Sequence, residues 1–549
     1  MKRGHSSVLT MGFAFVASLT TACSDDDDAS SQEGAASQAD ASTSSADAGA
    51  LRVKIESGEI EGAQLDTDVR AFLGIPYATP PVGELRWTLP QKPEAWKELR
   101  ATKEYGQRCA QPESTTLQNA ASDTEDCLYL NVWAPPAAAK PPAAVTKKPV
   151  MVWIHGGGNV NGSTSEPLPY VKSGFFYSGE HLAEKDVVVV TMNYRLGVFG
   201  FLAHAGLADK DGHSGNQGLL DQQFALQWVK QNIEKFGGDP ANVTIFGESA
   251  GSLDVCLHVA SPKSRGLFHR AISESGGCTT SQTTAQVAET RSAELAQKLG
   301  CSGDDSLKCL RGKSTEELLT AATGSTFSVS VDGSFLPDQA RALFDKGDIA
   351  KVPYILGSNT DEGTLFTTAL SNITTDEAYR AVISQRVGEK AADAVMERYP
   401  VSKFKDEPKP YQAALARVFG DQTLVCSTYD SALRAAKAGA PTWMYNFDSP
   451  ANMGGLGATH GSELVYVFGT SPNLSDPQKR ASERIQAYWT NLAKQADPHG
   501  ADLPKWPKFS AEQDVRLNLG LEFEVVEKFR TSECELWRSL YDASYNANK

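Results

Sequence analysis

The chain has 549 residues, of which 41% are hydrophobic and 22% are charged, a composition typical of globular proteins with a large apolar core. Its formal net charge of −15 argues against a nucleic-acid partner, because binding to phosphates normally requires a basic face. Length alone permits either several domains or one large α/β unit.

The first 23 residues have the features of an export signal. Lys2 and Arg3 precede an apolar run at 8–19, which is too short to span a membrane. The residues before Cys23 resemble the cleavage box of bacterial lipoproteins, although Thr20 stands where leucine is usual. We therefore expect an exported protein. It is either a cell-envelope lipoprotein whose only membrane contact is a lipid on Cys23, or a secreted or periplasmic protein cleaved before that residue.

Residues 24–50 consist almost entirely of small and polar residues, including four consecutive aspartates, and predict a flexible tether. Eight cysteines remain besides Cys23. An even number in an exported chain favours disulfides, with buried free thiols as the alternative. Spacing alone does not assign the pairs.

Strand and helix patterns alternate through the rest of the chain. Residues 51–78 predict short antiparallel strands, and helical patterns cover 216–236 and 286–299. Apolar, β-branched runs predict strands buried on both faces at 149–154, 187–194, 243–246, 270–272, 352–356 and 442–447. This alternation predicts an α/β fold with a large, mainly parallel central sheet flanked by helices.

A Gly-x-Ser-x-Gly motif at residues 247–251 contains the candidate nucleophile, Ser249. The motif alone is weak, but a predicted strand precedes it and a helical pattern follows at 252–260. Ser249 would therefore lie on a sharp strand-to-helix turn that exposes its hydroxyl, and glycines are needed where the backbone crosses closely.

A histidine and three glycines at 155–158 directly follow the predicted strand at 149–154. Nucleophilic attack on a carbonyl creates an oxyanion, which backbone amides can stabilise. The candidate donors are the amides of Gly157, Gly158 and Ala250. The run lacks the Gly-Lys-Ser/Thr ending of a phosphate-binding loop.

Elimination selects the candidate base. In α/β-hydrolases the nucleophile, the acid and the histidine follow in that order along the chain, and four histidines follow Ser249. His258 and His269 leave no room for an intervening acid, and His499 lies in a predicted exposed turn. His460 lies in a glycine-rich loop after a predicted strand and is the best candidate.

The acid is expected after the predicted strand at 352–356, where Asp361 and Glu362 are adjacent. Either carboxylate could orient the imidazole and stabilise its protonated form. Each could equally be a solvated loop charge. These arguments leave the choice between the two open.

Across residues 53–540 the chain resembles the type B carboxylesterases, which include the cholinesterases, within the α/β-hydrolase superfamily. The resemblance implies that Glu362 is the acid of a catalytic triad with Ser249 and His460, and that the activity is ester hydrolysis on small-molecule esters without a metal or organic cofactor. The matching blocks lie at 125–131, 155–158, 193–197, 236–240, 246–251, 264–268, 361–363 and 460–463.

The resemblance also implies three disulfides, and Cys256 and Cys278 lie outside that pattern. Since the candidate site residues are spread from 155 to 460, we expect residues 51–549 to form one catalytic domain. The alternative is a non-catalytic adhesion or receptor protein, because some members of the family keep the fold without the activity. The implied bridges are Cys109 to Cys127, Cys301 to Cys309 and Cys426 to Cys534.

One departure from the cholinesterases concerns the first disulfide loop, where those enzymes carry a tryptophan that holds a quaternary ammonium group. Residues 110–126 contain no aromatic residue, so choline esters are not expected as dedicated substrates. The segment at 323–328, which shapes the acyl pocket in relatives, has mostly small residues and suggests room for bulky acyl groups. The oligomeric state and the natural ester are not predicted.

Overall fold

The structure is a computed structural model that describes residues 51–114, 120–136, 146–167, 174–208, 214–449 and 455–547. The predicted signal peptide with Cys23, and the predicted tether, lie outside the described residues. No helix in the described ranges is long and apolar enough to cross a membrane.

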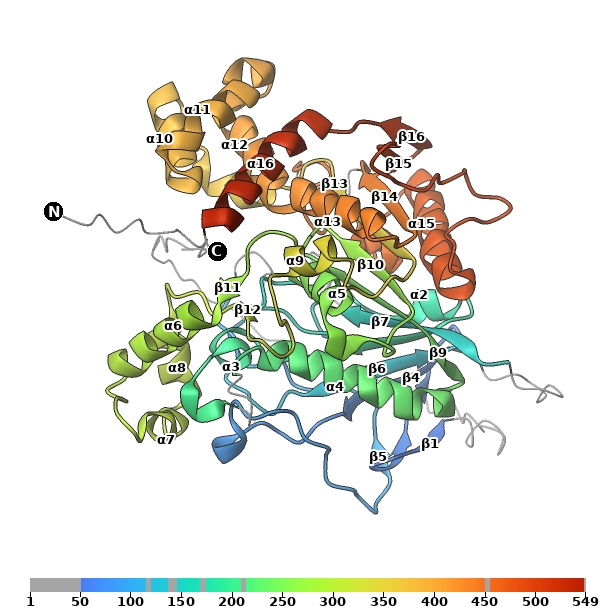
Figure 1. Ribbon diagram of the computed structural model, residues 1–549. Coiled ribbons are helices and arrows are strands. Elements are labelled where there is room, and N and C mark those ends of the chain that lie inside the picture. The colour runs from blue at the N-terminus through green and yellow to red at the C-terminus, as the bar shows by residue number, and fades with distance from the viewer. Residues whose placement is uncertain are drawn as a thin grey trace, which may run out of the picture.

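An 11-stranded sheet forms the centre of the molecule (Figure 1). Its strands in chain order are β3 (Ala63–Gln64), β4 (Arg70–Pro76), β6 (Tyr129–Ala134), β7 (Lys148–Ile154), β8 (Val188–Met192), β9 (Gly238–Glu248), β10 (Arg270–Glu274), β13 (Tyr354–Asn359), β14 (Thr442–Phe447), β15 (Val515–Leu519) and β16 (Phe523–Glu527). The neighbouring strands β8, β7, β9, β10, β13, β14 and β15 all run parallel. Antiparallel strands β6, β4 and β3 extend one side and β16 the other, so the predicted parallel centre is confirmed within a mixed sheet.

Helices cover both faces of this sheet, as consecutive residues of β7 show. Val150 and Val152 belong to one hydrophobic core, whereas Met151 and Trp153 belong to the other. Side chains alternate between the two faces of a strand, so an unbroken apolar run signals burial on both sides. Helices α4 (Gln217–Asn232), α5 (Ala250–Ala260) and α13 (Cys426–Lys437) contribute to the first core, and α2 (Glu180–Ala183), α14 (Leu464–Val467) and α15 (Asp476–Gln495) to the second.

The remaining elements surround this central part. Strands β1 (Arg52–Ile55), β2 (Gly58–Glu61) and β5 (Arg100–Ala101) form a small sheet, and β11 (Thr283–Thr284) pairs with β12 (Ser330–Val331). The other helices are α3 (Gly197–Phe201), α6 (Ala285–Lys298), α7 (Ser306–Arg311), α8 (Thr315–Ala322), α9 (Ala340–Asp345), α10 (Asp376–Val387), α11 (Glu389–Arg398), α12 (Pro410–Gly420) and α16 (Thr531–Ala547).

The predicted helices occur close to their expected positions. The pattern at 216–236 forms α4 followed by a 3₁₀ turn at Ile233–Phe236, and the pattern at 286–299 forms α6. Thr284 caps α6 because its side chain accepts a hydrogen bond from the amide of Val287.

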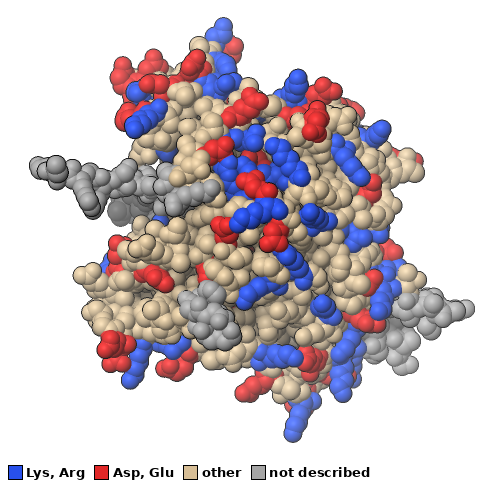
Figure 2. Space-filling model, viewed as in Figure 1, with Lys and Arg blue, Asp and Glu red and all other residues tan. Residues whose placement is uncertain are grey.

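Basic and acidic side chains mix over the face shown in Figure 2. Several ion pairs also join one element to another. Arg434 contacts Asp345 and Asp430, and Arg538 contacts Asp430 from α16. These ion pairs connect α9, α13 and the C-terminal helix.

Four disulfides link the chain. Three of them are the pairs that the resemblance implies, and the fourth joins Cys256 of α5 to Cys278 in the loop after β10. Four disulfides fit an extracellular or secreted protein.

The disulfides are expected to differ in their effect on stability. Cys426–Cys534 closes a loop of 108 residues and Cys301–Cys309 a loop of 8. A longer loop restricts the unfolded chain more, so alanine substitution of the first pair should lower the free energy of unfolding by about 5 kcal/mol and of the second by about 2.5 kcal/mol. Denaturant titration of the two double variants measures this difference, and equal losses would contradict it.

Candidate active site

Ser249 lies on the sharp turn between β9 and α5. It is the N-cap residue of α5, and its backbone has φ 57° and ψ −120°, a conformation that side-chain-bearing residues rarely adopt. Its amide donates to the carbonyl of Glu274 in β10 at 2.9 Å, which fixes the turn to the neighbouring strand. The Ser249 side chain is partly exposed and lies at the positive end of a helix.

Two glycines make this turn possible because β7 passes directly beside it. A Cβ atom at Gly251 would lie 2.0 Å from the carbonyl oxygen of Ile154, and one at Gly247 would lie 2.7 Å from the same oxygen. Any side chain at either position would therefore displace the end of β7. This close approach is the physical reason for both glycines of the motif.

The glycine run after β7 brings its backbone next to Ser249. A Cβ atom at Gly156 would lie 3.0 Å from the Cβ atom of Ser249. Gly157 and Gly158 have φ values of 104° and 68°, which favour glycine. Within the described ranges the amides of Gly157, Gly158 and Ala250 have no hydrogen-bond acceptor, so all three are available to an oxyanion.

His460 and Glu362 form a buried pair. The imidazole Nδ1 lies 2.7 Å from Glu362 Oε2, and the other carboxylate oxygen accepts the amide of Asn359 at 2.7 Å. Glu362 is 1% exposed. The carboxylate is thus fixed at both oxygens and orients the imidazole, with Phe366 packed against its ring at 5.1 Å between centroids.

Adjacent parallel strands position these groups. β9 ends at Glu248, directly before Ser249, and Glu362 and His460 follow β13 and β14. Strands β9, β10, β13 and β14 are consecutive neighbours in the sheet, so their carboxyl ends meet at one edge.

Asp361 faces away from the imidazole. Its Oδ2 accepts the amide of Ala458 at 3.2 Å, and its Oδ1 lies 3.8 Å from Arg417. It therefore stabilises the loop that carries His460 without contacting the histidine ring. The structure thus separates the two carboxylates that the sequence left equivalent.

The second nitrogen of His460 contacts Glu248 rather than the candidate nucleophile. Nε2 lies 3.1 Å from Glu248 Oε1, and the Ser249 hydroxyl has no hydrogen-bond partner among the described residues. Catalytic hydrogen bonds are often long or misaligned before substrate binds. Contact between Ser249 and Nε2 thus requires the hydroxyl to move toward the imidazole.

Several carboxyl groups are buried around this imidazole. Burial raises the pKa values of Glu463 and Glu248 above the usual range for glutamate. Burial also raises the pKa of Glu274 to about 8. Burial alone would lower the pKa of His460, but the negative charges of Glu248 and Glu362 outweigh it and raise this pKa to about 9. The protonated imidazole is therefore stabilised from both ring nitrogens.

Sequence reasoning missed Glu248 and Glu274. Glu248 is the second residue of the Gly-x-Ser-x-Gly motif, a position whose side chain the motif leaves unspecified. Glu274 ends β10, pairs with Glu248 in the strand register, and accepts a hydrogen bond from the indole of Trp489 at 3.0 Å. The sequence does contain a signal for Glu274, because an acidic residue at the carboxyl end of a strand predicted to be buried is unusual.

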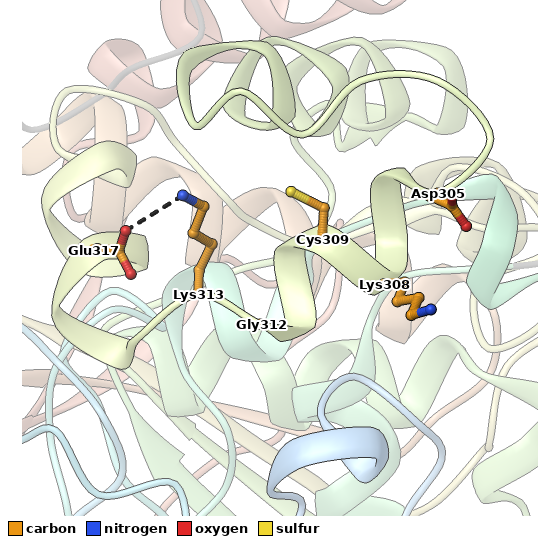
Figure 3. Close-up of a pocket in the computed structure, with 6 residues that line it drawn as sticks. All are labelled: Asp305, Lys308, Cys309, Gly312, Lys313 and Glu317. Atoms are coloured by element: carbon orange, nitrogen blue, oxygen red, sulfur yellow. Dashed lines mark hydrogen bonds and ion pairs between the residues drawn. The ribbon is translucent and has the colours of Figure 1, made fainter.

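A surface hollow of about 460 Å³ is lined by residues of α7, α8 and the segments beside them, and none of the candidate active-site residues lines it (Figure 3). Lys313 and Glu317 on its wall pair at 3.4 Å, so part of its charge is already neutralised. No cluster of three or more possible metal ligands occurs in the described ranges. The residues that line the hollow are Asp305, Lys308, Cys309, Gly312, Lys313 and Glu317.

A serine on a strand-to-helix turn, a glycine run beside it and a Glu362–His460 pair at the carboxyl edge of the sheet are typical of an α/β-hydrolase. Comparison with protein families matches residues 49–537 to the carboxylesterase family. The chain therefore belongs to the carboxylesterase family and is a carboxylesterase.

Two curated relatives match most of the chain. The cholinesterase of Mus musculus is 33% identical over 538 residues, which cover 89% of this chain and 86% of that protein. The fumonisin B1 esterase of Sphingopyxis macrogoltabida is 37% identical over 489 residues, which cover 84% of this chain and 85% of that protein. Both relatives are esterases by name, which supports ester hydrolysis as the activity.

The contact between Glu248 and His460 predicts a change in pH dependence. A histidine base must be neutral, so activity rises as the pH passes the pKa of His460. Glu248→Gln removes a negative charge that stabilises the protonated ring, so the acid limb of kcat/KM should move to lower pH by about one pH unit. Glu289→Gln, at an exposed position on α6, is the control. An unchanged limb in Glu248→Gln would show that this charge does not act on the histidine.

Proposed function

We propose that this carboxylesterase hydrolyses small-molecule esters through an acyl-enzyme on Ser249, with His460 as general base and Glu362 as the orienting acid. The observation that carries the proposal is the 2.7 Å pairing of His460 Nδ1 with Glu362, at the sheet edge where the strained serine turn also lies. Such a pair activates a serine hydroxyl that is otherwise a poor nucleophile.

In the first half-reaction the Ser249 oxygen attacks the ester carbonyl while its proton passes to His460 Nε2. The carbonyl oxygen becomes an oxyanion that the amides of Gly157, Gly158 and Ala250 stabilise. Collapse of this intermediate breaks the ester bond, and His460 returns the proton to the departing alcohol. Glu362 stays ionised and stabilises the imidazolium throughout.

In the second half-reaction water replaces the alcohol. His460 takes a proton from the water molecule, whose oxygen attacks the acyl carbon and forms a second oxyanion at the same amides. Transfer of the proton to the Ser249 oxygen then releases the carboxylic acid and restores the enzyme. No step requires a group beyond these side chains, the backbone amides and water.

Covalent labelling tests the nucleophile. A fluorophosphonate probe is expected to modify the wild-type protein on the peptide that contains Ser249, as read by mass spectrometry. Ser249→Ala should lose both the adduct and about a million-fold in kcat. An adduct that persists in the folded alanine variant would overturn the assignment of the nucleophile.

The two neighbouring carboxylates provide a matched test of the acid. Glu362→Gln should lower kcat by about 10³- to 10⁴-fold, because the imidazolium loses its buried counter-charge. Asp361→Asn should lower kcat by less than about 10-fold, because Asp361 contacts the loop and not the ring. The opposite order of the two effects would assign the acid to Asp361.

The alcohol side of the substrate is proposed to be uncharged. The segment 110–126 contains no aromatic face that could hold a quaternary ammonium group by cation–π attraction. The small residues at 323–328 are consistent with a broad acyl range. The relatives named cholinesterase and fumonisin B1 esterase show that the family includes esterases with different named substrates.

An ester pair tests this specificity. Acetylcholine and 3,3-dimethylbutyl acetate have nearly the same shape and differ in charge. We expect kcat/KM for the two esters to agree within about threefold, whereas a dedicated ammonium site contributes about 1–2 kcal/mol and would favour the choline ester by about 10-fold or more. Steady-state hydrolysis of both esters decides between the two outcomes.

We also infer that residues 1–23 direct export. The four disulfides support this inference, since they form in oxidising compartments. Lipidation of Cys23, with the segment 24–50 as the tether, is the form of export that we favour.

A further inference from the structure

Asn159 directly follows the glycine run and is bonded at every polar side-chain atom. It is 3% exposed and has a left-handed backbone with φ 57°. Its Nδ2 donates to Asp254 Oδ1 at 3.0 Å, and its carbonyl oxygen accepts the amide of Gly197 at 2.7 Å. Its Oδ1 lies 3.0 Å from the Tyr194 hydroxyl, whose single proton is shared between this oxygen and the carbonyl oxygen of His155 at 2.7 Å. The end of the glycine loop is therefore held in one orientation.

Asp254 lies on α5, the helix that begins directly after Ser249. It is fully buried, and within the described residues no Lys or Arg lies at ion-pair distance. Its second oxygen accepts Gln222 Nε2 at 2.7 Å, and Gln222 in turn contacts His258 Nε2 at 3.0 Å. A buried carboxylate without a cation is costly, and here only amide donors compensate it.

Burial raises the pKa of Asp254 to about 7, against the opposing effect of hydrogen bonds from Asn159 and Gln222. Both donors match the ionised carboxylate, since each oxygen receives one N–H group. Burial of a carboxylate without a cationic partner costs free energy even when neutral donors bond both of its oxygens. We therefore expect a role of Asp254 other than stabilising the fold.

The position of this contact indicates that role. The candidate oxyanion donors come from two separate segments, Gly157 and Gly158 from the loop and Ala250 from α5. Asn159 is the next residue after the first group, and Asp254 lies about one helical turn after Ala250. Their hydrogen bond thus joins the two halves of the oxyanion hole just behind the donors.

We propose that Asn159 and Asp254 are positioning residues that set the separation between the oxyanion loop and the nucleophile helix. The inference rests on the proposed acyl-enzyme mechanism and adds to it two residues that touch no substrate. A displacement of about 1 Å at such donors is enough to cost about 100-fold in rate. The contact would therefore act on kcat rather than on substrate binding.

Exchange of the two side chains provides the test. Asn159→Asp places two carboxyl groups face to face, and kcat should fall about 10- to 100-fold with KM little changed. Affinity for a trifluoromethyl ketone, which forms a tetrahedral adduct with an oxyanion, should fall by the same factor. Addition of Asp254→Asn restores a donor opposite an acceptor, and Gln222 can still donate to the side-chain oxygen at position 254, so the double variant should recover to within about fivefold of wild type.

Two further variants separate positioning from stability. Asn232→Ala removes another buried asparagine, which bonds the Glu56 amide and the Trp228 carbonyl far from the loop, and should lower the melting temperature without changing kcat or inhibitor affinity. Asn159→Gly removes the side chain at a backbone conformation that glycine accepts, and serves if Asn159→Asp fails to fold.

An unchanged kcat in folded Asn159→Asp or Asn159→Gly would overturn the inference. A double variant no more active than Asn159→Asp would also overturn it. Failure of the mechanism itself has a different signature, because the wild-type protein would then not bind the trifluoromethyl ketone, or Ser249→Ala would remain active.

Discussion

The close approach between the nucleophile turn and the end of β7 is the constraint on which the site depends. Gly247 and Gly251 both face the carbonyl oxygen of Ile154 at distances that exclude a side chain. The turn brings Ser249 to the glycine run that follows β7, because strand and loop are continuous. One backbone contact in the parallel register of β7 and β9 thus places the proposed nucleophile and the proposed oxyanion donors together.

The electrostatics of the site follow from burial on both faces of the sheet. The strands that position Ser249, Glu362 and His460 also bring Glu248 and Glu274 to the same edge. These carboxyl groups are buried, so they act strongly on the imidazole and on one another. The histidine is thereby tuned by the second residue of the nucleophile motif as well as by its own acid.

The sequence reveals those parts of the fold and site whose signals are local. Apolar runs predicted the central strands that the structure contains, and glycine spacing predicted that the turn at Ser249 and the glycine run at 155–158 would meet at one end of the sheet. Asp361 and Glu362 could not be separated, because the turn after β13 decides which one faces His460. Glu274 and Asp254 were not predicted as site residues, because strand register and helix packing, and not the neighbouring sequence, bring them to the site. The helices at 376–420 were also not predicted.

The disulfide between Cys256 and Cys278 has a consequence for local unfolding. It joins the helix that begins at the nucleophile to the loop after the neighbouring strand, and both cysteines are fully buried. While this bond is intact, helix α5 cannot move far from the end of strand β10, so the two elements are expected to open together in hydrogen exchange. The helix that begins at Ser249 is thus covalently tied to the segment after its neighbouring strand whenever this region opens locally.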